Sequence, residues 1–237
     1  MIFFDYKLYF QTKEDGGGFM AYGVRLEVWG EAACFTRPEL KAERFSYAVM
    51  TPSAARGVLE AIFWHPGLRW QIDRIFILSQ IRFANVRRNE LKAKISARNV
   101  TAFAGKERGE LYQCTKEDIQ QRASTILKEP HYIIEAHFEM TEKASASDNE
   151  GKFREMFCRR ARKGQCYHTP YLGCREFPAR FRLYEEEELP QTNGETKDLG
   201  FMLYDIDYSD PKNLQPMFFQ AQLVDGVLDL RDCEVYR

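Results

Sequence analysis

The strongest hydrophobic pattern in the chain is helical and lies in residues 47–66, YAVMTPSAARGVLEAIFWHP. Thr51 occupies the position of an N-cap, and Pro52 follows at the first helical position, where a missing N–H costs nothing. The apolar residues that come next recur at helical spacing: Val58, Leu59, Ile62 and Phe63. Pro66 ends the pattern. The sequence therefore predicts a capped helix that packs on a sheet.

A second helical pattern and several extended patterns accompany it. The segment Lys152–Lys163 predicts a helix with its apolar residues on one side. Apolar runs and alternations predict strands at Tyr22–Phe35, Trp70–Leu78, Ile81–Val86, His131–Glu142 and Tyr171–Tyr184. The second and third of these strands are close enough in sequence to pair as a hairpin. The charged segment Arg87–Lys128 is predicted to be an insertion with a short helix near Glu117–Leu127.

The order of these elements predicts the fold class. Strand, helix, strand, strand, insertion, strand, helix and strand come close to the β-α-β-β-α-β unit of ferredoxin-like folds, the architecture of RNA-recognition modules (RRM-like). From Glu185 the chain is acidic and rich in turns, with short strands predicted at Gly200–Ile206, Phe218–Val224 and Val227–Leu230 and a hairpin turn at Asp225-Gly226. We therefore predict an α+β protein with an N-terminal extension (1–19), a ferredoxin-like domain with an insertion (20–184) and a small C-terminal β-sheet subdomain (185–237).

Composition narrows the class of protein. The chain has 237 residues, of which 44% are hydrophobic and 29% charged, as in ordinary folded domains. No apolar run approaches the roughly 20 residues of a membrane span, and the N-terminus lacks the basic region and cleavage site of a signal peptide. The six cysteines include no C-x-x-C pair, and the four histidines are scattered. We expect reduced thiols, a cytoplasmic location, no metal, no cofactor and no membrane partner.

The charges are unevenly distributed along the chain, although the net charge is only −1. Between Arg82 and Arg98, six basic residues and one acidic residue give a local charge of +5. Between Lys152 and Arg182, nine basic and two acidic residues give +7, and from Leu183 to the C-terminus four basic and thirteen acidic residues give −9. Phe and Tyr lie among the basic residues. This layout suits phosphate contacts and base stacking, although a solvated charged face has the same pattern.

Three long strings resemble one known family: LEVWGEAACFTRPELKAERFSYAVMTPSAARGVLEAIFWHP, IRFANVRRNE and KGQCYHTPYLGCREFPARF. They are similar to the CRISPR-associated family-five protein of type I-C systems (Dvulg subtype, subtype d), a member of the RAMP superfamily. The resemblance runs from about Met20 to the C-terminus. It implies a ferredoxin-like domain with a small C-terminal sheet, and metal-independent cutting of precursor CRISPR RNA within the repeat hairpin. It also implies that the protein stays bound to the 5′ handle of the mature crRNA, as a subunit of the type I-C interference complex.

The resemblance also implies a set of catalytic positions. Metal-free RNA cleavage needs a base for the 2′-hydroxyl, a cation for the transition state and an acid for the leaving 5′-oxygen, and it yields a 2′,3′-cyclic phosphate. The pattern associated with this family has a tyrosine that matches Phe63, a lysine that matches Lys152 and a histidine that matches Phe153. Two of the three functional groups are therefore absent, and Lys152 alone carries over.

Nearby residues are candidates for the missing groups. Three residues could supply them: Tyr47, Tyr167 and His168. The predicted catalytic residues are Lys152, Tyr47 and His168. Each has a plainer interpretation: Lys152 as a solvated lysine, Tyr47 as a packing residue with a bonded hydroxyl, and His168 as the partner of a loop carbonyl. His65 is predicted to cap the helix C-terminus. His131 and His137 share one strand face and are interpreted as structural.

Arginine forks match phosphate geometry but hold their protons too tightly to transfer them at neutral pH. The predicted RNA-binding residues are therefore Arg82, Arg87, Arg88, Arg159, Arg160 and Lys163. The leading hypothesis is an endoribonuclease of CRISPR RNA maturation. The alternative is a non-catalytic RNA-binding scaffold that contacts the other subunits of the complex. A third interpretation is nonspecific binding of duplex DNA through the same basic surface.

Overall fold

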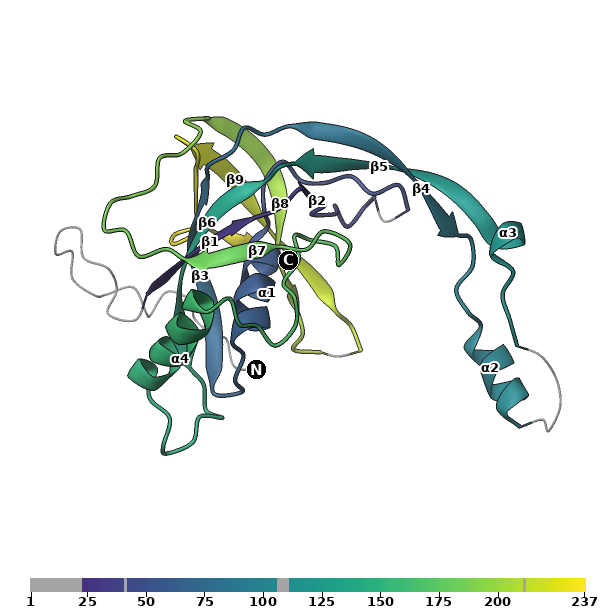
Figure 1. Cartoon of the computed structure of the whole chain (residues 1–237), viewed down its shortest axis with the longest axis horizontal. Coiled ribbons are helices and arrows are strands. Elements are labelled where there is room, and N and C mark those ends of the chain that lie inside the picture. The colour runs from purple at the N-terminus through teal and green to yellow at the C-terminus, as the bar shows by residue number, and fades with distance from the viewer. Residues whose placement is uncertain (1–22, 41, 106–110, 211) are drawn as a thin grey trace.

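The computed structural model describes residues 23–40, 42–105, 111–210 and 212–237 as a mixed α/β fold dominated by antiparallel sheets (Figure 1). The predicted extension, residues 1–19, and its boundary at Met20 lie outside the described residues. In the described part, no helix is long and apolar enough to cross a membrane.

The larger sheet has eight strands, and β11-β9-β10-β3-β6-β1-β7 are neighbours in that order, with β8 beside β9. Its strands are β1 (Val24–Trp29), β3 (Leu68–Ile77), β6 (His131–Met140), β7 (Arg180–Leu183), β8 (Lys197–Asp207), β9 (Gln215–Val224), β10 (Val227–Asp229) and β11 (Val235–Tyr236). The C-terminal strands, predicted to form a small sheet, are continuous with the main sheet. Leu228 of β10 pairs with Ile75 of β3, so the C-terminal strands extend the main sheet and cover an edge that would otherwise be unpaired.

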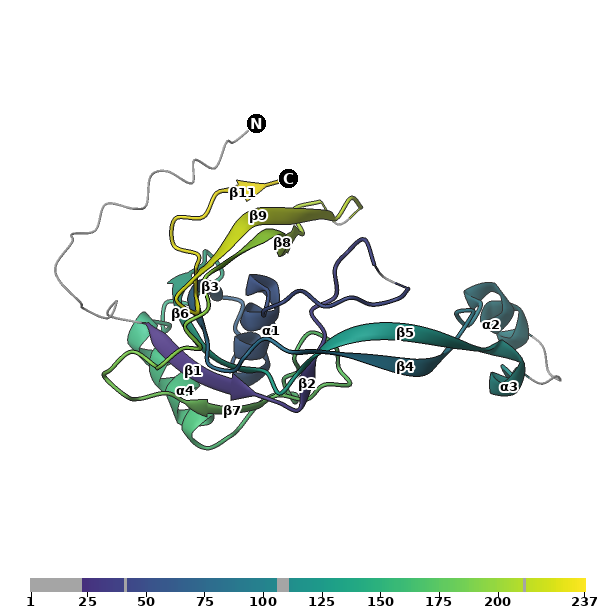
Figure 2. The same ribbon diagram turned by 90° about the horizontal axis from the view of Figure 1, so that it is seen from above.

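The smaller sheet is a long ribbon. It consists of β2 (Ala32–Ala33), β5 (Ile119–Lys128) and β4 (Phe83–Leu91), in that order. Figures 1 and 2 show β4 and β5 projecting from the rest of the protein, with α2 (Ala97–Ala104) and α3 (Thr115–Asp118) at the far end.

Two predictions about this region are wrong. The strand predicted at 81–86 does not pair with β3, because β4 pairs with β5 from Phe83↔Leu127 to Leu91↔Ile119. The helix predicted at 117–127 is strand β5, preceded by the four residues of α3. The insertion is therefore a hairpin whose distal part has no core to face, and along β4 exposed side chains alternate with half-buried ones.

The two predicted helices are present. In α1 (Pro52–Ile62), Thr51 is the N-cap and its side chain accepts a hydrogen bond from the Ala54 N–H, as expected. The helix stops at Ile62, earlier than predicted, because Phe63 is already extended. In α4 (Glu150–Arg162), Asn149 is the N-cap and accepts from the Lys152 N–H.

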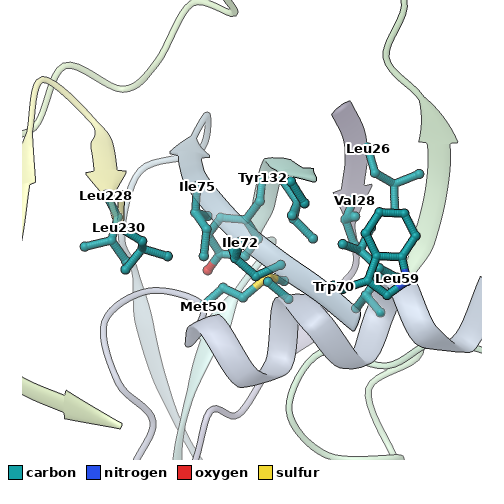
Figure 3. Close-up of a cluster of buried hydrophobic side chains, with 14 of the residues drawn as sticks. Leu26, Val28, Met50, Leu59, Trp70, Ile72, Ile75, Tyr132, Leu228 and Leu230 are labelled. Atoms are coloured by element: carbon teal, nitrogen blue, oxygen red, sulfur yellow. The ribbon is translucent and has the colours of Figure 1, made fainter. Parts of the chain in front are cut away.

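The core lies where α1 and α4 cover one face of the main sheet. Figure 3 shows Leu59 of α1 beside Trp70 of β3, with Leu26 and Val28 on β1, which is separated from β3 by β6. All four side chains are at most 2% exposed. Burial of each such side chain contributes roughly 1.5–3 kcal/mol to the hydrophobic stabilisation of the fold.

Strand β1 is buried on both faces, whereas the sequence predicted a half-buried strand. Arg25 and Glu27 are each 6% exposed. Arg25 Nε donates to Glu135 Oε2 at 2.8 Å, and Glu27 Oε1 lies 2.8 Å from His131 Nε2. Pairing compensates the desolvation of these charges. His131 is thus a structural residue, as interpreted from the sequence.

The segment predicted as a strand from Tyr171 to Tyr184 is mostly a loop. An isolated bridge joins Tyr171 to Pro178, and β7 occupies only residues 180–183. Gly173 fixes the loop against β2, because its φ is +82° and an added Cβ would lie 2.1 Å from the Cys34 carbonyl oxygen. Close approach of the two backbones therefore replaces strand pairing here.

Candidate active site

The candidate site lies where the end of α1 meets α4 and the loops around it. Two neighbours satisfy carbonyls at the C-terminus of α1: Arg160 Nη1 donates to the Ile62 oxygen at 2.9 Å, and the Tyr167 N–H donates to the Ala61 oxygen at 2.8 Å. These bonds replace the partners that the last helical turn lacks. They fix α1 against α4 and thereby position the residues that follow α1.

Lys152 lies in the first turn of α4 and is paired with Asp148. Its Nζ is 2.8 Å from Asp148 Oδ1, and the lysine side chain is 43% exposed while Asp148 is 5% exposed. The other carboxylate oxygen, Oδ2, accepts from the backbone N–H and the hydroxyl of Ser145 at 2.9 and 2.8 Å. The hydrogen bond from Lys152, followed by those from Ser145, holds the pKa of Asp148 well below its usual range. The lysine is thus oriented but accessible.

His65 completes this cluster, and the sequence did not identify it as a site residue. Its Nε2 lies 4.0 Å from Asp148 Oδ2, and its side chain is 34% exposed. The Gly67 N–H donates to His65 Nδ1 at 3.0 Å. The prediction that His65 caps the helix is wrong, because α1 ends at Ile62 and Phe63 is its C-cap. The only sequence signal was its place just beyond the helix, in the Trp-His-Pro turn.

Phe63 and Phe153, the positions at which the resemblance expects a tyrosine and a histidine, are core residues. They are 3% and 1% exposed, and their ring centroids lie 5.8 Å apart. The His65 imidazole packs on Phe153 at 4.8 Å. An imidazole therefore lies beside the position where the resemblance expects one, although it comes from the loop after α1. Trp64, between Phe63 and His65, is 62% exposed.

Tyr47 lies in the core, away from solvent. It is 2% exposed, its hydroxyl accepts a hydrogen bond from the Leu203 N–H at 3.2 Å, and the Arg37 guanidinium lies 4.7 Å from its ring centre. Burial raises the pKa of its hydroxyl. These contacts favour the packing role of Tyr47 over proton transfer.

His168 lines an open pocket of about 310 Å³ together with Thr169, Pro170, Tyr171 and Arg175. Its Nδ1 is 3.4 Å from the Thr169 carbonyl oxygen. The neighbouring Tyr167 ring is 88% exposed. The structure thus places His168 in a pocket of its own, built from the loop after α4, and not in the cluster of Lys152, Asp148 and His65.

The six predicted RNA-binding residues fall on two separate elements. Arg87 and Arg88 are on β4, with Arg82 just before that strand, whereas Arg159 and Arg160 are on α4 and Lys163 caps it. Three are engaged: Arg82 pairs with Glu129, Arg88 with Glu90 and Glu176, and Arg160 with a carbonyl of α1. The other three are exposed, without an ion-pair partner among the described residues: Arg87, Arg159 and Lys163.

The arrangement at Lys152 can bind an anion. The lysine presents an ammonium group and His65 an imidazole edge on the same side of α1 and α4, and both are partly exposed. A phosphate oxygen is the natural ligand of two such donors. Among the residues that the structure describes, no group of three or more His, Cys, Asp or Glu side chains could hold a metal ion.

Comparison with known proteins agrees with the family named from the sequence. A model of the subtype-d branch of the CRISPR-associated family-five proteins matches residues 23–231. A curated protein of Mannheimia succiniciproducens, named CRISPR pre-crRNA endoribonuclease Cas5d, is 51% identical over 217 residues, which are 89% of this chain and 96% of the relative. A protein of the same name from Thermus thermophilus is 40% identical, over 87% of this chain and 90% of the relative.

Two solved structures share the fold. A crystal structure of a CRISPR-associated protein superposes with a TM-score of 0.64 at 23% identity, covering 91% of this chain and 96% of the other. A protein of Streptococcus mutans, described as functionally uncharacterized, gives a TM-score of 0.63 at 21% identity, covering 91% and 97%. With the family model spanning residues 23–231 and the two curated relatives matching along almost their whole length, the chain belongs to the Cas5d family of CRISPR-associated proteins.

Proposed function

We propose that the protein is an endoribonuclease that cuts precursor CRISPR RNA within the repeat hairpin without a metal ion. The observation that carries the proposal is the 51% identity to a curated relative named as a pre-crRNA endoribonuclease, over 96% of that relative. The exposed ammonium of Lys152 supports it, since this is the one family position that keeps its functional group.

The proposed reaction is an internal transfer within the RNA. The 2′-oxygen forms a bond to phosphorus, the bond from phosphorus to the 5′-oxygen breaks, and a 2′,3′-cyclic phosphate and a 5′-hydroxyl result. The 2′-hydroxyl loses its proton to a base and the 5′-oxygen gains one from an acid. Lys152 stabilises the extra negative charge on the phosphate oxygens in the transition state. His168 stays our candidate for one of the proton transfers, since its ring is exposed at a pocket edge next to Arg175. This role requires the loop after α4 to approach Lys152 when RNA binds, because the pocket of His168 is separate from the Lys152 cluster.

We propose further that residues 20–184 form a ferredoxin-like domain and residues 185–237 a small β subdomain whose strands continue the main sheet. The strand order β3-β6-β1-β7, with every pair antiparallel and with α1 and α4 between strands, supports this. RNA-recognition modules of this kind read single-stranded RNA on a sheet or helix surface. The exposed cations Arg87, Arg159 and Lys163 supply phosphate contacts on either side of such a unit.

A second candidate function is a non-catalytic RNA-binding scaffold. The burial of Phe63 and Phe153, at 3% and 1% exposure, favours it, because neither residue can move a proton. In either case we propose that the protein works in the cytoplasm, holds the 5′ handle of the crRNA and joins the other subunits of the type I-C interference complex. Nonspecific binding of duplex DNA to the same cations is a weaker proposal of electrostatic origin.

One experiment separates the two functions. The purified protein is incubated with its own repeat RNA in EDTA, and the products are mapped on a sequencing gel. Cutting at one position, with a 5′-hydroxyl on the downstream fragment, is expected, and Lys152→Ala is expected to slow it about 10²–10³-fold. Tight binding without a cut would favour the scaffold. A cut that Lys152→Ala leaves unchanged would remove Lys152 from the mechanism.

A further inference from the structure

We propose that His65 is a second catalytic residue of the same site: its Nε2–H donates a hydrogen bond to a non-bridging oxygen of the scissile phosphate, next to Lys152. This inference rests on the proposed endoribonuclease function. His65 lies in the turn after α1, and Asp148 is within 4.0 Å of its Nε2 and within 2.8 Å of Lys152 Nζ. The two side chains therefore flank one carboxylate and reach the same volume.

The hydrogen bond at the other ring nitrogen decides the role of His65. The Gly67 N–H donates to Nδ1 at 3.0 Å, so Nδ1 carries a lone pair and the ring proton resides on Nε2. In this tautomer Nδ1 is occupied as an acceptor, and Nε2–H is the donor at the other edge of the ring. A neutral imidazole in this state can stabilise negative charge that develops on an oxygen in the transition state.

The backbone around His65 fixes the direction of this donor. A Cβ on Gly67 would lie 2.7 Å from the Ala144 Cα, so the turn after α1 packs directly on the loop before α4. The imidazole packs at a tilt against the Phe153 ring, with 4.8 Å between centroids, and Phe153 is 1% exposed. The Phe153 ring restrains the imidazole, and the Gly67 N–H occupies Nδ1. Nε2 is therefore the ring nitrogen that remains open to a ligand.

Nε2 has no hydrogen-bond partner among the described residues, and the His65 side chain is 34% exposed. Its distance of 4.0 Å to Asp148 Oδ2 exceeds a hydrogen bond, and Oδ2 itself accepts two bonds from Ser145. Lys152 uses one of its three N–H groups on Asp148 Oδ1 and keeps two. A phosphate oxygen that meets His65 Nε2–H and Lys152 Nζ together would satisfy both donors, while the ammonium offsets the charge of Asp148.

The test compares three substitutions of His65 in single-turnover cutting of the repeat RNA in EDTA. His65→Gln keeps an N–H near the position of Nε2, whereas His65→Asn places its amide near Nδ1 and His65→Ala has none. We expect His65→Ala and His65→Asn to cut about 10²–10³-fold more slowly, as for loss of one oxyanion donor, and His65→Gln to stay within about tenfold of the wild type. RNA binding by all three is expected to change less than about threefold, with unaltered melting temperatures. His137→Gln serves as the matched control and is expected to cut at the wild-type rate.

The outcomes distinguish this inference from the proposed function. If the wild type cuts and His65→Ala cuts as fast, or if His65→Asn retains as much activity as His65→Gln, the role of His65 is overturned and the endoribonuclease stands. If the wild type binds the repeat RNA without cutting it, both are overturned. If the rates fall only in proportion to lost RNA binding, His65 is a binding residue and the catalytic assignment fails.

Discussion

The imidazole of His65 packs against the ring of Phe153 with 4.8 Å between the two centroids and a tilt of 45° between the ring planes. Phe153 contributes the buried side of this contact and His65 the partly exposed side. The His65 imidazole therefore packs against an apolar side chain of the core. Substitutions on the two sides of this contact should behave differently.

Phe153→His, which restores the residue of the family pattern, is expected to destabilise the fold without accelerating RNA cutting. The side chain at 153 is 1% exposed and packs against the rings of Phe63, Phe138 and His65, so an imidazole there would be buried in a largely apolar site. The cost should be about 1–3 kcal/mol of unfolding free energy. Urea unfolding and the single-turnover rate measure the two effects, with Phe153→Leu as an apolar control. A rate increase of tenfold or more would contradict the burial of this site.

Asp148→Asn is expected to separate RNA binding from RNA cutting. The substitution removes the negative charge that orients Lys152 at 2.8 Å, but it keeps an acceptor for Ser145. RNA affinity should rise up to about fivefold because repulsion is relieved, while the cutting rate should fall about 10–100-fold because the ammonium loses its fixed position. Filter binding and single-turnover kinetics give the two numbers. If the variant and the wild type have equal RNA affinities and cutting rates, Asp148 is not needed to orient Lys152.

Charge reversal on β4 is expected to depend on which arginine is changed. Arg87 is exposed without an ion-pair partner among the described residues, whereas Arg88 pairs with Glu90 and Glu176. Arg87→Glu should weaken RNA binding and lower the slope of log K against log salt by at least about 0.7, the value for one phosphate contact of a single strand. Arg88→Glu should instead lower the melting temperature. Titrations at several salt concentrations test this, and identical salt slopes for wild type and Arg87→Glu would remove Arg87 from the interface.

The pair of His137 and Asp73 is expected to make stability depend on pH. His137 Nδ1 lies 2.9 Å from Asp73 Oδ1, and this hydrogen bond raises the pKa of the histidine, with a smaller contribution from Glu139. A raised pKa in the folded state means that the stabilisation is complete below the unfolded-state pKa of about 6.5 and is lost as the pH rises through the folded-state pKa. The wild type should exceed His137→Gln by about 1 kcal/mol, or roughly 2–4 °C in Tm, near pH 5.5. The difference should shrink by about pH 9, and a constant difference would contradict the assignment.

Local signals in the sequence were enough to predict the two main helices. Thr51 and Pro52 specify the start of α1 by capping and by the fixed φ of proline, and both effects act within one turn. Asp225 and Gly226 specify the turn between β9 and β10, where both residues have positive φ, as expected for a two-residue hairpin.

Pairing over long distances was not predictable in the same way. The sequence of β4, FANVRRNEL, has no apolar face, because the ribbon extends into solvent and its partner β5 supplies hydrogen bonds instead of a core. Hydrophobic periodicity reports which residues are buried, and these strands bury few residues. The sequence therefore predicted an insertion where the structure has two long strands. The pairing of β10 with β3 likewise joins residues about 150 positions apart, which no local pattern encodes.

The family and the place of Lys152 at the start of a helix therefore follow from the sequence alone, since they depend on long strings and on short-range capping. The side chains that surround Lys152 are determined by tertiary structure. His65 and Asp148 come from loops next to different helices, and they meet because α1 and α4 pack against each other and Gly67 lets the turn after α1 approach Ala144. Phe63 and Phe153 are most simply interpreted as core residues from the sequence, and their burial confirms it. Only the packing of α1 and α4 decided that the imidazole beside Phe153 belongs to His65.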